Sequence, residues 1–241
     1  RVLGFPVFAR HARGYALTEA GRALLPAAKA MGDAAARLAL AAEGRSERLA
    51  GTVRITASVM VATYWLPEIV GPLRRAEPEI QIEIVPSDRS ENLLYREADI
   101  ALRMYRPEQL DVVTRHLGDV SLGFFAHRDY LARRGCPATV EQLTAHELIG
   151  LDRAEDLIRW ARAFGLDATR EDFDLRCDDH GVIWQMVRAG AGIGVGHVPM
   201  ASREPDLEQL FPGLDLPVLP VWLTAPEAIR TTPRIRRVWD L

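Results

Sequence analysis

From Gly51 onward, strand-like runs alternate with helix-like stretches, and this alternation restricts the possible folds more than any other feature of the chain. Residues 80–84, Ile-Gln-Ile-Glu-Ile, alternate strictly between apolar and polar side chains, as a half-buried strand does. Strands that alternate with helices are typical of βαβ units around a parallel sheet. We therefore expect an α/β fold for this part of the chain.

The alternation occurs in two successive series. A proline-rich stretch follows them and leads to the last predicted strand and helix. Strands are predicted at 53–57, 80–84, 99–104, 122–126, 148–151, 175–177, 193–198 and 218–224. Helices are predicted from Ser58 through Leu73 and at 90–97, 156–164, 182–189 and 233–241. This order indicates a bilobal fold with a cleft, in which residues 51–121 and 201–241 form lobe I and residues 122–200 form lobe II.

The segment before Gly51 is different, because few helix-breaking residues occur between positions 18 and 48. Thr18 is a good helix N-cap, and Pro26 should kink the helix or lie near its first turns. Small and apolar residues recur at alternating steps of three and four, which is the a/d pattern of helices that pair. The predicted dimerisation residues are Leu24, Ala28, Met31, Ala35 and Leu38. The alternative is a helix that packs on its own domain.

The first 50 residues are basic, whereas the rest of the chain is acidic. Residues 1–50 carry eight Arg or Lys and four Asp or Glu, a net charge of +4, and because the whole chain carries −3 the remaining residues carry −7. Residues 4–17 also resemble a hairpin whose tip, Arg10 to Gly14, is basic. These features favour contact with a polyanion at one end, although chance clustering on a solvated helix explains the charge equally well.

Several classes of protein are disfavoured. No run of eighteen apolar residues occurs, so we expect no membrane span. Cys136 and Cys177 are too few for a disulfide scaffold and fit free thiols in a reducing cytoplasm. The chain starts at Arg1 without a signal segment, so we expect a piece of a longer cytoplasmic protein.

Five segments resemble LysR-type transcriptional regulators, and together they extend over essentially the whole chain. They are residues 3–10 (LGFPVFAR), 17–21 (LTEAG), 51–55 (GTVRI), 87–89 with 99–103 (SDR and DIALR), and 188–194 (RAGAGIG). The resemblance implies that residues 1–17 are the remnant, mainly the wing, of a winged helix-turn-helix. It also implies a linker and dimerisation helix at 18–50, followed by a periplasmic-binding-protein-like effector domain. The recognition helix would lie upstream of Arg1.

The resemblance also implies partners. These are double-stranded operator DNA, a small-molecule effector, and other copies of the chain in a homodimer or homotetramer. Arg10, His11 and Arg13 lie at the predicted wing tip and are the candidates for phosphate contacts. A solvated turn is the alternative for these residues.

The effector would bind between the lobes, where the strands end. Ligands of open α/β sheets bind beyond the carboxyl ends of strands, and helices that start there present free N–H groups. An anionic effector would suit such a place. The candidate cleft residues are Ser58, Val59, Ser87, Asp88 and Arg103 from lobe I, and Asp152, His180 and His197 from lobe II.

Structural roles compete with several of these assignments. An ion pair with Asp99 explains Arg103 equally well, and a lone histidine is more often a structural hydrogen-bonding residue. Asp179 is a candidate N-cap for the helix that begins near Val182.

No catalytic, metal or cofactor site is predicted. Residues 178–180 are adjacent and lack distant Cys or His partners, so a metal site is disfavoured. The glycines of 190–196 follow a helix and lead into a strand, the reverse of the order in a dinucleotide fingerprint. No nucleophile elbow occurs. We therefore expect a regulator that is not an enzyme; the alternatives are a two-lobed solute-binding protein without a DNA role and an α/β enzyme.

Overall fold

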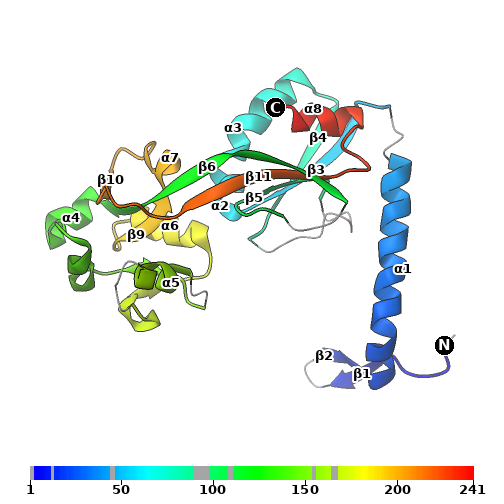
Figure 1. Ribbon diagram of the computed structural model, residues 1–241, viewed down its shortest axis with the longest axis horizontal. Helices are drawn as coiled ribbons and strands as arrows, with labels where there is room; N and C mark the ends of the chain where they lie inside the picture. The colour runs from blue at the N-terminus through cyan, green and yellow to red at the C-terminus, as the bar shows by residue number, and fades with distance from the viewer. Residues whose placement is uncertain are drawn as a thin grey trace.

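The computed structural model describes residues 3–11, 14–43, 47–88, 98–107, 111–153, 156–163 and 168–241. It consists of an N-terminal hairpin, one long helix and a two-lobed body, with the hairpin and the body at opposite ends of the helix (Figure 1). The mixed α/β fold expected from the sequence is confirmed. The helix predicted at 90–97 lies outside the described residues.

The N-terminal hairpin forms as the sequence predicted, whereas the long helix predicted through residues 48–50 begins as expected but ends earlier. Strands β1 (Phe8–His11) and β2 (Gly14–Leu17) pair antiparallel. Helix α1 spans Glu19–Glu43, and residues 47–50 are not helical. The Thr18 hydroxyl accepts a hydrogen bond from Gly21 N at 3.0 Å and donates to Pro6 O, so one side chain caps α1 and anchors the hairpin.

The first lobe has a mixed sheet covered by helices. Its elements are β3 (Gly51–Ala57), α2 (Val59–Tyr64), α3 (Leu66–Ala76), β4 (Ile80–Pro86), β5 (Ile100–Arg103) and α8 (Pro233–Trp239). Strand β3 is parallel to both β4 and β5, so the carboxyl ends of these strands lie at one edge. Val53, Ile80 and Ile235 are fully buried in the core beneath them.

The second lobe is built from short elements around two smaller hydrophobic clusters. They are α4 (Arg128–Arg134), a 3₁₀ helix (Val140–Ala145), β7 (Ile149–Gly150), α5 (Asp156–Ala163), a second 3₁₀ helix (Arg170–Asp172), β8 (Leu175–Arg176), α6 (His180–Arg188), β9 (Gly194–His197), α7 (Val198–Ala201) and β10 (Leu207–Leu210). The expected capping of α6 by Asp179 is confirmed, because its side chain accepts a hydrogen bond from Val182 N at 2.9 Å.

Two long antiparallel strands join the lobes (Figure 1). Strand β6 runs over Val112–His127 and β11 over Val218–Pro226. The expectation of a short strand at 122–126 was wrong in extent, because β6 begins ten residues earlier. The boundaries of the lobes stay a prediction; β10 pairs with the end of β6, at Phe124–His127.

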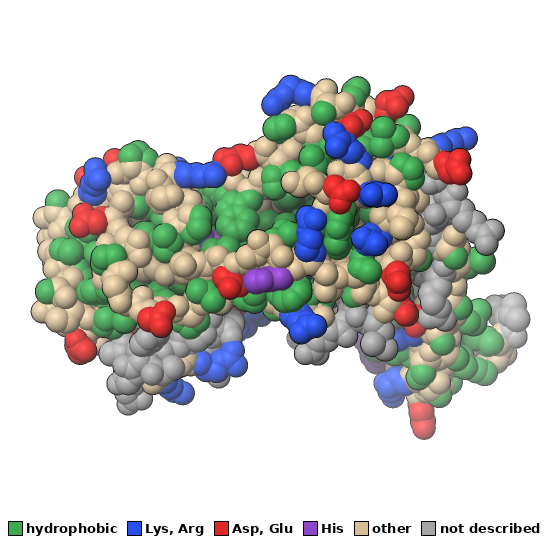
Figure 2. Space-filling view, turned by 45° about the horizontal axis from the view of Figure 1, so that its top comes forward, with side chains coloured by type: hydrophobic (Ala, Val, Ile, Leu, Met, Phe, Trp, Pro, Cys, Tyr) green, Lys and Arg blue, Asp and Glu red, His purple; other side chains and the backbone are tan. Residues whose placement is uncertain are grey.

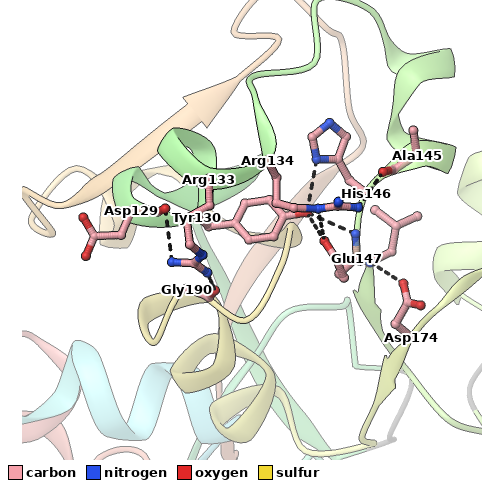
Figure 3. A network of polar contacts seen from close by, with 10 residues as sticks. Asp129, Tyr130, Arg133, Arg134, Ala145, His146, Glu147, Asp174 and Gly190 are labelled. Carbon is pink, nitrogen blue, oxygen red and sulfur yellow. Dashed lines mark hydrogen bonds and ion pairs between the residues drawn. The ribbon is translucent and has the colours of Figure 1, made fainter.

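A polar network around Tyr130 ties α4 to the segment before β7 (Figure 3). The buried Tyr130 hydroxyl donates to Glu147 Oε2 at 2.7 Å and accepts from Glu147 N at 3.0 Å. Arg134 Nε donates to the same carboxylate at 3.1 Å. Burial is the main cause that raises the pKa of Tyr130. The network therefore holds the outer part of the second lobe through a tyrosine that stays protonated.

Candidate functional site

A small cavity of about 70 Å³ lies between the lobes. Its lining comes from α2 and β11 of the first lobe, from β9, α6 and the residue after β7 of the second lobe, and from one residue of β6. The lining residues are Met60, Leu122, Leu151, His180, Ile183, Trp184, Val195, Gly196, His197 and Leu219. Hydrophobic side chains also gather on the surface where the molecule is narrow, between the lobes (Figure 2).

Ser58 and Asp88 meet at the start of α2, beyond the ends of β3 and β4. Ser58 Oγ accepts a hydrogen bond from Val61 N at 3.4 Å, and Asp88 Oδ1 accepts one from Val59 N at 3.1 Å. These two N–H groups, which were expected to face an anionic ligand, are thus bound to side chains of the protein itself.

Asp88 also reaches the second lobe. Its Oδ2 lies 3.6 Å from His180 Nδ1, on the first residue of α6. The hydrogen bond with His180 is the largest cause that holds the pKa of Asp88 below its ordinary value, while partial burial opposes it. The structure therefore brings two predicted site residues from different lobes into contact.

Arg103 is buried at the end of β5 and is absent from the cavity lining. Its guanidinium donates to Thr56 Oγ1 at 3.0 Å and lies 3.5 Å from Ser87 O. The Asp99 carboxylate, the alternative partner for Arg103, accepts a hydrogen bond from Arg54 N at 2.8 Å. Arg103, at the end of β5, thus links this strand to β3 and to the backbone at Ser87.

His197 and Asp152, the other predicted residues of lobe II, differ in their surroundings. His197 lines the cavity and is only 7% exposed. Burial, with a smaller effect from His180, lowers the pKa of His197 to about 4, so its imidazole is neutral at physiological pH. Asp152 does not line the cavity, and its carboxylate forms an ion pair with Arg170.

The lobes contact each other at further points. Gln185 Nε2 on α6 donates to Tyr64 OH on α2 at 2.9 Å. Met60, also on α2, belongs to the hydrophobic cluster of the second lobe. Arg203 pairs with Glu68 of α3. Helix α2 therefore packs directly against the opposite lobe.

Trp184 and Met60 are cavity residues that the sequence did not single out. Trp184 is 1% exposed, and its Nε1 has no hydrogen-bond partner in the described part of the chain. Gly196 makes room for the ring, because a Cβ at this position would lie 2.3 Å from Trp184 Cζ3. A buried tryptophan on a helix is an ordinary core residue in sequence, so no local signal distinguishes it.

The predicted wing and dimerisation residues are exposed to different degrees. Arg10 and His11 are both exposed on β1, whereas Arg13 lies outside the described residues. On α1, Leu24 is half-buried, while Ala28 and Ala35 are exposed. Met31 is 75% and Leu38 is 73% exposed, so part of the predicted stripe makes little contact within the single chain.

Neither a metal-binding cluster nor a membrane-spanning helix occurs among the described residues. No group of His, Cys, Asp or Glu within those ranges is arranged to hold a metal ion. None of the helices there is both long and apolar enough to cross a bilayer. Cys136 and Cys177 are free thiols.

Comparison with known proteins gives consistent results. The family model described as the LysR substrate binding domain matches residues 46–241. The HTH-type transcriptional regulator CrgA of Neisseria meningitidis serogroup C is 29% identical over 111 residues, which are 46% of this chain and 37% of that protein. The HTH-type transcriptional regulator cbl of Escherichia coli is 28% identical over 223 residues, 87% of this chain and 68% of that protein.

Solved structures show the same fold. CrgA, a LysR-type transcriptional regulator from Neisseria meningitidis, aligns with a TM-score of 0.68 at 22% identity, over 99% of this chain and 83% of that chain. The full-length Vibrio cholerae virulence activator AphB aligns with a TM-score of 0.69 at 19% identity, with the same two coverages. The sequence match to CrgA, by contrast, spans less than half of that protein's length.

Proposed function

The chain belongs to the LysR substrate-binding domain family, and from this premise we propose that it is part of a LysR-type DNA-binding transcriptional regulator. Its two-lobed domain binds a small-molecule effector in the cavity between the lobes. The observation that carries this proposal is the cavity itself, which both lobes line. The protein acts in the cytoplasm by binding and is not an enzyme.

An effector at this place can influence the arrangement of the lobes. His180, which lines the cavity, contacts Asp88 of the other lobe, and Tyr64 with Gln185 forms a second interlobe contact. A ligand shifts a conformational equilibrium only by its difference in affinity for the two arrangements. A molecule that touches both walls has such a difference, because opening the cleft removes one set of its contacts.

Double-stranded operator DNA is the partner proposed for the other end of the chain. The wing carries Arg10, His11 and Arg13, and basic side chains at a wing suit the phosphate backbone. The stripe on α1 joins two copies in a homodimer, or in a homotetramer made of such dimers. Rearrangement of the lobes then changes the spacing of the DNA-binding heads. A two-lobed solute-binding protein without a DNA role is the competing function.

The test is a gel shift with DNase footprinting. The protein is the product of the complete gene, the probe is the intergenic DNA beside that gene, and two salt concentrations are used because salt controls phosphate-driven affinity. We expect a protected site that spans two half-sites and weaker binding by an Arg10→Ala, Arg13→Ala double variant. An Arg230→Ala variant, altered at an exposed position of the body, is the matched control. Binding that is only nonspecific would favour the solute-binding alternative.

A further inference from the structure

We propose that the cleft takes an uncharged, largely apolar small molecule that presents a hydrogen-bond acceptor to Trp184, in place of the anion expected from the sequence. This inference rests on the proposed function, because it assigns the ligand class of the same cleft. Three features carry it: the apolar walls, the balance of charge, and the indole N–H of Trp184.

The walls of the cavity are mainly hydrophobic. Seven of the ten lining residues are hydrophobic, an eighth is Gly196, and the only titratable ones are His180 and His197. Such a surface favours a ligand that leaves water at little cost. The small volume of about 70 Å³ suits a compact molecule.

No described group supplies an uncompensated positive charge to the cavity. His197 is neutral at physiological pH, because burial lowers its pKa to about 4. His180 faces the carboxylate of Asp88 at 3.6 Å, so a proton on its ring is balanced. An anion would therefore lose its hydration without gaining a free cation, which is unfavourable in apolar surroundings.

Arg103, the expected countercharge, is placed for another role. Its guanidinium donates to the hydroxyl of Thr56, and the carbonyl of Ser87 lies within reach. Neither Arg103 nor these partners line the cavity. The N–H groups at the start of α2 are likewise bonded to Asp88 and Ser58. The features that favoured an anion in the sequence are thus used within the protein.

Trp184 provides the polar contact. The indole N–H is a donor only, and buried donors are almost always paired in native proteins. Trp184 Nε1 is buried and has no partner among the described residues, and the side chain lines the cavity. Gly196 receives one edge of the ring, and Phe125 packs edge-on at 5.8 Å between ring centroids, so the indole is held in a fixed orientation. A hydrogen-bond acceptor on the ligand would give the Trp184 N–H the partner that it lacks among the described residues.

The test uses neutral and anionic probes of matched shape with the 241-residue chain. The pairs are phenol with benzoate and 2-butanone with butyrate, and the readouts are the thermal unfolding midpoint and calorimetric affinity. We expect phenol or 2-butanone to bind and raise the midpoint, while the matched anion does not. A Trp184→Phe variant keeps an aromatic ring but lacks the N–H, and we expect it to bind the neutral probe about fivefold more weakly.

Trp222→Phe is the matched control. The Trp222 indole Nε1 is also buried without a partner in the described ranges, but this residue lies outside the cavity lining. We expect the loss of the Trp222 N–H to leave the affinity for the neutral probe unchanged. An equal loss in both variants would overturn the assignment to Trp184, as would a Trp184→Phe variant that binds as tightly as the parent chain.

The outcomes separate the ligand class from the proposed function. Tighter binding of benzoate or butyrate than of the neutral partner overturns the ligand class but leaves an effector cleft in place. If no probe of either class binds, the ligand class is overturned. The proposed function fails independently, when the footprint described above is absent.

Discussion

Acidification should destabilise the protein through His197, and the effect is large enough to measure. The side chain is 7% exposed, and burial lowers its pKa from 6.5 to about 4. The unfolded chain therefore binds a proton near pH 6.5, whereas the folded protein binds it only near pH 4. Since the unfolded state binds more protons in this window, folding stability falls as the pH drops through it.

The magnitude follows from the two pKa values. Between about pH 7.5 and about pH 5, an unfolded-state pKa of 6.5 and a folded-state pKa of about 4 correspond to a loss of about 2 kcal/mol in the free energy of unfolding. Asp88 has a lowered pKa, so its stabilisation is present above its unfolded value of 3.8 and is lost only at lower pH. It does not contribute in this window.

The assay is urea unfolding of the parent chain and of a His197→Gln variant at both pH values. The difference between the two proteins removes the contributions of groups that titrate alike in each. We expect this difference to change by about 2 kcal/mol, with the variant less sensitive to acid. A difference that stays constant between the two pH values would refute the argument from burial.

Two further changes test other parts of the molecule. Tyr130→Phe should lower the free energy of unfolding by about 1–3 kcal/mol in urea titrations, because a backbone N–H in the second lobe loses its acceptor; unaltered stability would contradict the role of the network. Leu24→Glu with Leu38→Glu should lower the mass measured by analytical ultracentrifugation to that of a monomer, whereas Ala23→Glu with Ala30→Glu, off the stripe of α1, should not. Equal behaviour of the two pairs would count against dimerisation through this stripe.

Single strands and helix caps could be predicted, because the sequence pattern that specifies each of them lies within the element or next to it. The alternation at 80–84 corresponds to β4, Ile80–Pro86, and the hydroxyl of Thr18 caps α1 as expected. The first half of β6 was not predicted, because most of its residues before Val120 are exposed or half-buried and lack an apolar alternation. Its strand conformation depends on pairing with β11, more than ninety residues later in the sequence.

The candidate site was predictable only in part. Strand ends identified the region in which Asp88 and His180 meet, because parallel strands place their carboxyl ends at one edge. The partners of these groups depend on the packing of one lobe on the other. Sequence could not show that Asp88 occupies Val59 N, or that the indole of Trp184 lacks an acceptor.

The two strands that join the lobes also determine how the gene can be divided. Ser121 of β6 and Val218 of β11 are paired neighbours in the sheet, so residues 122–217 form an insertion that begins and ends at the same place. Replacing this insertion with a tight turn should give a continuous coding unit for the first lobe. A simple C-terminal truncation should fail, because β11 lies between β5 and β6 and any fragment that ends before Val218 lacks the strand joining them. Deletion series of this protein should therefore be designed as internal excisions.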